Sequence, residues 1–78
     1  NEPAPTVLRV HRQRISRDAV LEAFTAANVS ARPTRFAPDG IVLETPLDPA
    51  GLPGHADGWF AVQGEASQLV ALLVGSPP

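Results

Sequence analysis

Four arginines fall within a short stretch near the start of the chain, at Arg9, Arg12, Arg14 and Arg17. Arginine carries several N–H donors in a planar fork and stays charged at all ordinary pH values, so it suits phosphate oxygens. Phosphate contacts hold a nucleic acid in place without reading its sequence. We therefore predict that these four arginines bind a phosphate-bearing polyanion. The alternative, ordinary solvated arginines, stays open on the sequence alone.

Few other residues are candidates for metal binding or catalysis. His11, His55 and Asp57 are candidate metal ligands, but His11 is far from the other two in sequence, and a solvated loop histidine is the favoured interpretation of His55. Ser67 lacks the Gly-x-Ser-x-Gly setting of an activated serine. The chain has no Cys, which excludes disulfides, thiolate metal sites and a cysteine nucleophile. We predict no catalytic residue and no metal site.

The charge is unevenly distributed along the chain. All six basic residues are arginines within residues 1–35, together with three acidic residues, whereas residues 36–78 hold five acidic residues and no basic one. This asymmetry is compatible with one side that binds a polyanion and another side that faces away from it.

Length and composition indicate a single small domain. A chain of 78 residues buries only roughly 60% of its unfolded surface, so its core is small. The sequence begins at Asn1 rather than Met, and we interpret it as a piece of a longer protein. Its longest apolar run, residues 69–74, is too short to cross a membrane. We expect a cytoplasmic setting.

The first half of the sequence predicts a strand, a helix and a second strand. Residues 6–13 alternate, with Leu8 and Val10 on one face. Ser16 is a suitable N-cap for a helix that runs to about Ala27, and Asn28 is a suitable left-handed residue to end it. The side chains expected to be buried by this helix are those of Val20, Ala23, Phe24 and Ala27. Residues 30–36 form the second strand, and Pro33 places it at a sheet edge.

The second half predicts two further strands and a closing helix. Residues 37–40 form a turn before a strand at 41–45, and at most a short helix from Asp48 precedes a strand at 59–63. Trp59 and Phe60 are adjacent, so they point to opposite faces of that strand and one of them is core. The resulting order, β-α-β-β-(short α)-β-α, predicts an α+β, ferredoxin-like or RNA-recognition-motif-like fold. It has a four-stranded antiparallel sheet with helices on one face, plus a C-terminal linker helix.

The closing helix, from Glu65 to about Val74, has more apolar residues than one face requires. One stripe is formed by Ala66, Leu69, Val70 and Leu73, and the residues that widen it are Ala71, Leu72 and Val74. We expect one side to pack on the sheet and the other, including Leu72, to face a neighbouring domain. The alternative is that the helix only closes the core of the small domain.

Two blocks of this sequence resemble a known family. "LRVHRQRIS" and "LPGHADGWFAVQGEASQLVALLVG" resemble the region before the catalytic domain of the bacterial Sun/Fmu (NOL1/NOP2/Sun) RNA cytosine-C5 methyltransferases. The order of LPG, Gly58, an aromatic residue, Val62-Gln63 and the segment from Glu65 to Gln68 carries the likeness. Two residues depart from the family pattern, since His11 stands where Asn is usual and Gly64 where Asp is usual.

The resemblance implies a non-catalytic fragment of an S-adenosylmethionine-dependent enzyme that methylates ribosomal RNA. Residues 1–64 would form the accessory RNA-binding domain, and residues 65–78 the interdomain helix and the start of the catalytic domain. The cofactor and the catalytic cysteines would lie outside this chain. The expected contacts with the catalytic domain are made by Gln63, Ser67, Leu72 and Val74. The alternative function is a non-catalytic structural or protein-interaction module that braces a neighbouring domain; a ligand-sensing domain is least favoured, since no polar pocket motif is visible.

Overall fold

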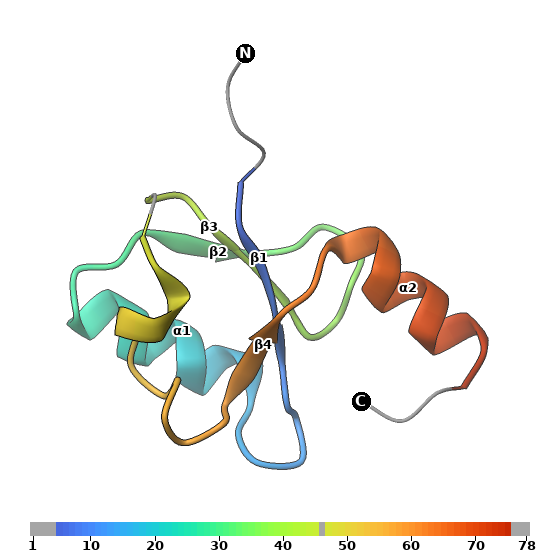
Figure 1. The fold of residues 1–78 in the computed structure, drawn as a ribbon, viewed down its shortest axis with the longest axis horizontal. Helices are drawn as coiled ribbons and strands as arrows, with labels where there is room; N and C mark the ends of the chain where they lie inside the picture. Colours follow the sequence, from blue (N-terminus) through green and yellow to red (C-terminus); the bar gives the residue numbers. More distant parts are fainter. Residues whose placement is uncertain (1–4, 46, 76–78) are drawn as a thin grey trace.

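The computed structural model describes residues 5–45 and 47–75, and it shows a four-stranded antiparallel sheet with one helix against a face (Figure 1). The strands are β1 (Val7–Val10), β2 (Ala31–Pro33), β3 (Gly40–Leu43) and β4 (Phe60–Val62). The helices are α1 (Arg17–Ala26), the short 3-10 helix η1 (Pro49–Gly51) and α2 (Glu65–Leu73). The strands lie in the order β2-β3-β1-β4, with β2 at an edge. This topology confirms the predicted ferredoxin-like fold class.

The register of the sheet separates an apolar face from an open face. Leu8 on β1 pairs with Ile41 on β3 and with Val62 on β4, and Val10 pairs with Phe60. Because side chains alternate across a strand, Leu8 and Val10 point to the same side, and Arg9 points to the other. The apolar face and α1 together form the core, whose buried members are Leu8, Val10, Val20, Phe24, Ile41, Leu43, Leu52 and Phe60.

Local signals explain the limits of α1. The Ser16 hydroxyl accepts a hydrogen bond from the Ala19 amide at 3.1 Å, which satisfies one of the free N–H groups of the first turn. Asn28 follows the helix with a φ of 61°, as predicted for its end. The prediction that Ala27 is buried was wrong, because the helix ends at Ala26 and Ala27 is exposed in the turn that follows it.

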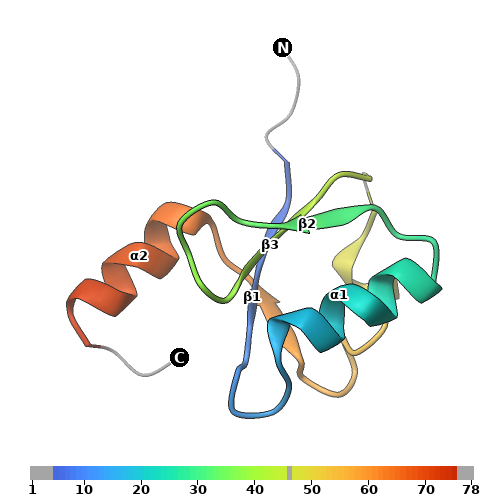
Figure 2. The ribbon, with the colours of Figure 1, turned by 180° about the vertical axis from the view of Figure 1, so that it is seen from behind.

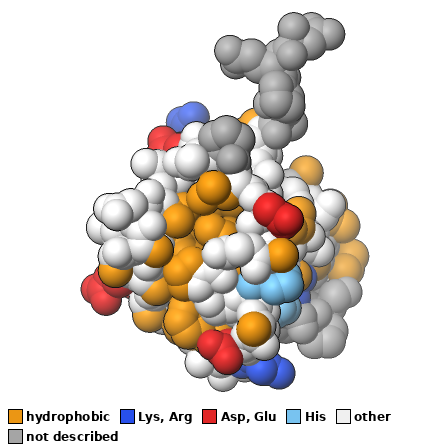
Figure 3. Space-filling view, turned by 60° about the vertical axis from the view of Figure 1, so that its left-hand side comes forward, with side chains coloured by type: hydrophobic (Ala, Val, Ile, Leu, Met, Phe, Trp, Pro, Cys, Tyr) orange, Lys and Arg blue, Asp and Glu red, His pale blue; other side chains and the backbone are white. Residues whose placement is uncertain are grey.

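Between β3 and β4, residues 44–45 and 47–59 are described and hold one short helix, η1, where a full β-α-β-β-α-β arrangement has a second full helix. Figure 3 shows apolar side chains gathered on the side of the molecule that carries α1 and η1. A hollow of about 590 Å³ lies there, and its lining includes Val29, Leu47 and Leu52. The short helix therefore covers less of the sheet than a full helix would.

The glycine-containing loop before β4 positions the two aromatic residues. Gly54 has a φ of 87°, and a Cβ at this position would collide with the Trp59 indole ring. Leu52 and Phe60 enter the core, and Trp59 packs against its edge while remaining half-buried. The prediction that one of the two aromatic residues is core is confirmed for Phe60.

Helix α2 lies on the other side of β1 from α1 in both ribbon views (Figures 1 and 2). Its residue range agrees with the expected start at Glu65, but its expected apolar packing on the sheet was wrong. Gln68 is its only buried residue, whereas Val70 and Leu73 are 57% and 86% exposed. Polar side chains hold this helix in place, as described below. No helix within the described residues is long and apolar enough to cross a membrane.

Candidate functional site

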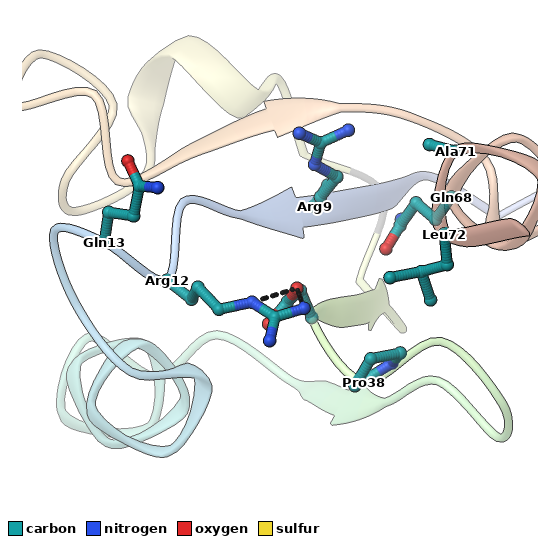
Figure 4. Close-up of a pocket in the computed structure, with 8 residues that line it drawn as sticks. Arg9, Arg12, Gln13, Pro38, Gln68, Ala71 and Leu72 are labelled. Atoms are coloured by element: carbon teal, nitrogen blue, oxygen red, sulfur yellow. Dashed lines mark hydrogen bonds and ion pairs between the residues drawn. The ribbon is translucent and has the colours of Figure 1, made fainter. Parts of the chain in front are cut away.

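A groove of about 260 Å³ lies between α2 and the open face of the sheet (Figure 4). Arg9 comes from β1, Arg12 from the loop after it, and Asp39 from the turn between β2 and β3. The remaining lining residues are Gln13, Pro38, Gln68, Ala71 and Leu72. The groove therefore combines two guanidinium groups, one carboxylate, two carboxamides and an apolar wall.

Arg12 is held in the groove by Asp39. Its Nη2 lies 2.8 Å from Asp39 Oδ2, and its Nε donates a hydrogen bond to the same oxygen at 3.0 Å. The Arg12 side chain is 53% exposed, so part of its guanidinium still faces solvent. A partly exposed pair of this kind adds only about 0–1 kcal/mol to stability. Its main effect is to fix the orientation of the guanidinium plane.

Arg9 lies on the open face of the sheet beside the groove. Its Nη1 donates a hydrogen bond to Gln63 Oε1 at 2.9 Å. Gln63 follows β4, so this bond links the middle of β1 to the segment that leads into α2. The guanidinium of Arg9 is thus oriented by the protein before any ligand arrives.

The other two predicted arginines lie elsewhere. Arg14 donates to the Asp57 carbonyl at 3.2 Å and lines a second hollow of about 340 Å³ with His11, Gln13 and Gly58. Arg17 donates to the carbonyls of Ala37 and Gly40, at 3.0 and 3.4 Å, and so supports the turn before β3. Of the four arginines, the structure brings only Arg9 and Arg12 together in one groove.

The fold brings together charges that are segregated in the sequence. Arg12 pairs with Asp39, and Arg32 Nε lies 3.8 Å from Glu44 Oε2. Both pairs join the arginine-rich first part of the chain to the acidic second part. The expected separation into a basic side and an acidic side is therefore reduced by direct pairing.

Glu65 attaches the start of α2 to the loop between β2 and β3. Its Oε2 accepts hydrogen bonds from the backbone amides of Phe36 and Ala37, at 2.6 and 2.9 Å. The bond from Ala37, then that from Phe36, lowers the pKa of Glu65 below its ordinary value of 4.5, and the charges of Arg32 and Arg35 lower it further. No role was predicted for Glu65 from the sequence.

Gln68 attaches the same helix to the sheet. Its Nε2 donates to the carbonyl oxygens of Leu8 and Gln63, at 3.2 and 2.7 Å, and the residue is only 3% exposed. No role was predicted for Gln68 from the sequence either. The available signal was the spacing of Glu65 and Gln68, since residues three apart lie on one side of a helix, and the remainder of α2 is mostly apolar.

The four residues expected to contact a neighbouring domain lie in different settings. Gln63 is half-buried and bonded to Arg9, and Ser67 is exposed on α2. Leu72 is 48% exposed and lines the groove, whereas Val74 is 69% exposed immediately after α2.

The histidines do not come together with acidic groups as a metal site. Within residues 5–45 and 47–75, no group of three or more His, Asp and Glu side chains is arranged to hold a metal ion. His55 is exposed, and its ring lies 6.2 Å from that of Phe60, edge to face.

Comparisons with known proteins give a consistent result. A family model described as "Methyltr_RsmF/B-like, ferredoxin-like domain" matches residues 1–49. The chain is 45% identical over 78 residues to ribosomal RNA small subunit methyltransferase B of Pseudomonas syringae pv. tomato, which covers the whole chain but 17% of the relative. The protein of the same name from Pseudomonas putida is also 45% identical over the whole chain, which spans 18% of that relative. A probable ribosomal RNA small subunit methyltransferase B from Coxiella burnetii is 39% identical over 95% of this chain and 17% of its own length.

Proposed function

Because this chain belongs to the RsmF/B-like methyltransferase family and matches its ferredoxin-like domain, we propose that it is an accessory RNA-binding domain. It would help to position ribosomal RNA for cytosine-C5 methylation by the rest of the enzyme. The observation that carries this proposal is the groove in which Arg9 and Arg12 are both held by other side chains. Donors fixed in this way lose less conformational entropy when they bind a phosphate or a base.

The arrangement of the arginines supports contact with the RNA backbone. Arg12 is half-exposed, and Arg14 is exposed beside the second hollow, so each has guanidinium donors that still face solvent. Gln13 lines both the groove and the hollow beside Arg14, and it lies between the two arginines in one loop. We assign Arg12 and Arg14 to phosphates, Arg9 to the wall of the groove, and Arg17 mainly to support of the turn.

The exposed side of α2 supports contact with another part of the same enzyme. Val70, Leu73 and Val74 are three and four positions apart, so they share one helical side, and all three are more than half exposed. The chain spans less than a fifth of the length of the relatives named above. We propose that this side packs on the catalytic domain, with Ser67 and Val74 in the contact and with Gln63 and Leu72 beside it at the groove.

This division gives residues 1–64 the role of the RNA-binding domain and residues 65–78 that of the connection to the catalytic domain. S-adenosylmethionine would bind outside this chain. Within the described residues no strand leads through a glycine-rich turn into a helix, since the turn between β1 and α1 holds no glycine and the turn between β4 and α2 holds one, Gly64. Calorimetry with S-adenosylmethionine and this chain should show no heat of binding; micromolar affinity would contradict the proposed division.

The test of RNA binding is a salt series with single-stranded RNA. Each phosphate contact adds about 0.7 to the slope of log affinity against log salt. Replacing both Arg12 and Arg14 by Gln should therefore flatten that slope by roughly 1.4. The control variant replaces Arg32 and Arg35 by Gln. This change removes the same charge, but these two residues line neither the groove nor the hollow beside Arg14.

The two variants separate local contacts from net charge. The proposal is supported if the control variant keeps the salt slope of the wild type while the variant that lacks Arg12 and Arg14 has a flatter slope. If both variants follow the wild-type line, these arginines contact no phosphate. The exposed side of α2 would then favour the second candidate function, a module that braces a neighbouring domain.

A further inference from the structure

We infer that the groove between α2 and the sheet holds one unpaired RNA base, which donates a hydrogen bond to Gln68 Oε1; this inference rests on the proposed RNA-binding function. The first observation is that Gln68 Oε1 is a buried acceptor with no hydrogen-bond partner among the described residues. The residue is only 3% exposed, and it lines the groove. Figure 4 shows its oxygen directed toward the space between Arg12 and Leu72.

The orientation of the Gln68 carboxamide is fixed by its neighbours. Its nitrogen faces two carbonyl oxygens, those of Leu8 and Gln63, and donates to both. Exchanging the positions of nitrogen and oxygen would place an acceptor against two acceptors, so the oxygen is the atom that points away from these carbonyls, in the direction seen in Figure 4. A buried acceptor left without a donor costs free energy, and a ligand that supplies a donor recovers it.

The groove requires a donor rather than an anion at this point. Phosphate oxygens accept hydrogen bonds at neutral pH and cannot satisfy Gln68 Oε1. The carboxylate of Asp39 also lines the groove, and it offsets the charge of Arg12, with which it pairs. Each of the four RNA bases, by contrast, carries an amino or imino N–H on its Watson–Crick edge, and that edge is free only in unpaired RNA.

The walls of the groove fit a flat ring. Pro38, Ala71 and Leu72 give apolar contact, and the guanidinium groups of Arg9 and Arg12 give planar surfaces on which bases stack. The volume of about 260 Å³ lies below the range of about 300–1,000 Å³ that is typical of pockets for drug-sized ligands. One base fits this description better than a longer segment of peptide or of duplex.

The ligand side of the test uses the 78-residue chain and a single-stranded oligouridylate. Uracil has one donor, at N3, so an oligonucleotide of the same length built from N3-methyluridine keeps the phosphates and removes the donor. We expect roughly tenfold weaker binding of the methylated RNA, since the buried Gln68 acceptor is left unpaired. Equal affinities would overturn the inference, because a water molecule would then suffice for Gln68.

The protein side compares Leu72→Glu with Ala66→Glu. Both changes add one charge to an exposed position of α2, but only Leu72 lines the groove, and Ala66 lies on the other side of the helix. Leu72→Glu should weaken oligouridylate binding by roughly tenfold, whereas Ala66→Glu should change it by less than about twofold. In Leu72→Glu the difference between uridine and N3-methyluridine should also disappear.

The outcomes distinguish this inference from the function on which it rests. Salt-dependent RNA binding without any effect of N3-methylation would overturn the base site and leave the RNA-binding domain. An N3-methylation effect that persists in Leu72→Glu would place the base elsewhere, which also overturns the inference. A complete lack of RNA binding by the wild-type chain would overturn both.

Discussion

The side-chain amide of Gln68 donates a hydrogen bond to the carbonyl oxygen of Leu8 across 3.2 Å, although the two residues are 60 positions apart in the sequence. Together with the bonds that Glu65 accepts from Phe36 and Ala37, this contact fixes α2 beside the sheet. The helix is thus attached through its polar residues, and its apolar side is turned outward. Such an arrangement leaves an apolar surface for a further contact and a groove beneath the helix.

The outward side of α2 should contribute little to the stability of this chain. Replacing Leu73 by Ser should change the free energy of unfolding by no more than about 0.5 kcal/mol, as for other exposed positions. Replacing the fully buried Phe24 by Ala should cost about 3–5 kcal/mol. Chemical denaturation of both variants is the measurement. A loss above about 1 kcal/mol for Leu73→Ser, in a monomer, would show that this side chain packs within the chain.

The attachment of α2 should weaken in acid. The amides of Ala37 and Phe36 lower the pKa of Glu65, so its charged form is favoured in the folded state. A lowered pKa means that this stabilisation is complete above the unfolded value of about 4.5 and is lost as the pH falls through the folded pKa. The protection of the Phe36 and Ala37 amides against exchange, measured relative to the intrinsic rate at each pH, should therefore fall as the pH is lowered over this range.

Glu65→Gln supplies the comparison for the acid effect. It should give exchange at these two amides that is faster than in the wild type at neutral pH and that lacks the acid-dependent step. Glu22→Gln, at an exposed position of α1, should behave as the wild type. If the acid-dependent step persists in Glu65→Gln, a group other than Glu65 causes it.

The loop before β4 should depend on Gly54. Gly54→Ala places a Cβ against the Trp59 ring at a residue whose φ is 87°, so it should destabilise the chain by at least about 1–2 kcal/mol. Gly51→Ala is the matched control, since nothing lies within 4 Å of its added Cβ. That change should be neutral or slightly stabilising. Thermal unfolding followed by Trp59 fluorescence compares them, and equal midpoints would contradict this account of the loop.

The last turns of α2 should open more readily than the sheet. No buried apolar residue holds the helix beyond Gln68, whereas Leu8 and Val10 in β1 are fully buried. Native-state amide exchange should accordingly show lower protection at Leu72 and Leu73 than at Leu8 and Val10. Equal protection in the monomer would mean that α2 packs more tightly on the rest of the chain than its exposed side chains indicate.

Much of the fold was predictable because its signals are local. Ser16 as an N-cap, Asn28 as a left-handed end and Pro33 on an edge strand each depend on a few neighbouring residues, and the structure agrees with all three. The burial of Ala27 was mispredicted because it depends on whether the helix ends one residue earlier or later, and sequence patterns are least informative at helix ends.

The candidate site was less predictable because it depends on contacts between distant segments. Arg9 and Arg12 were identified from residue type, but their partners Gln63 and Asp39 were not, since neither spacing nor pattern links them. The inward roles of Glu65 and Gln68 were also missed. A mostly apolar helix normally buries its apolar side, and here two polar residues take that place.

The most direct test of the central claim is an NMR titration of the chain with a single-stranded RNA oligonucleotide. We expect the largest shifts at the side-chain amide of Gln68 and at the guanidinium Nε–H groups of Arg9 and Arg12, with salt-dependent shifts at Arg14. The backbone amides of Val70, Leu73 and Val74 should move little, because the apolar side of α2 faces away from the groove. Shifts confined to that apolar side, or no shifts at the groove at low salt, would contradict the assignment of this chain as an RNA-binding domain.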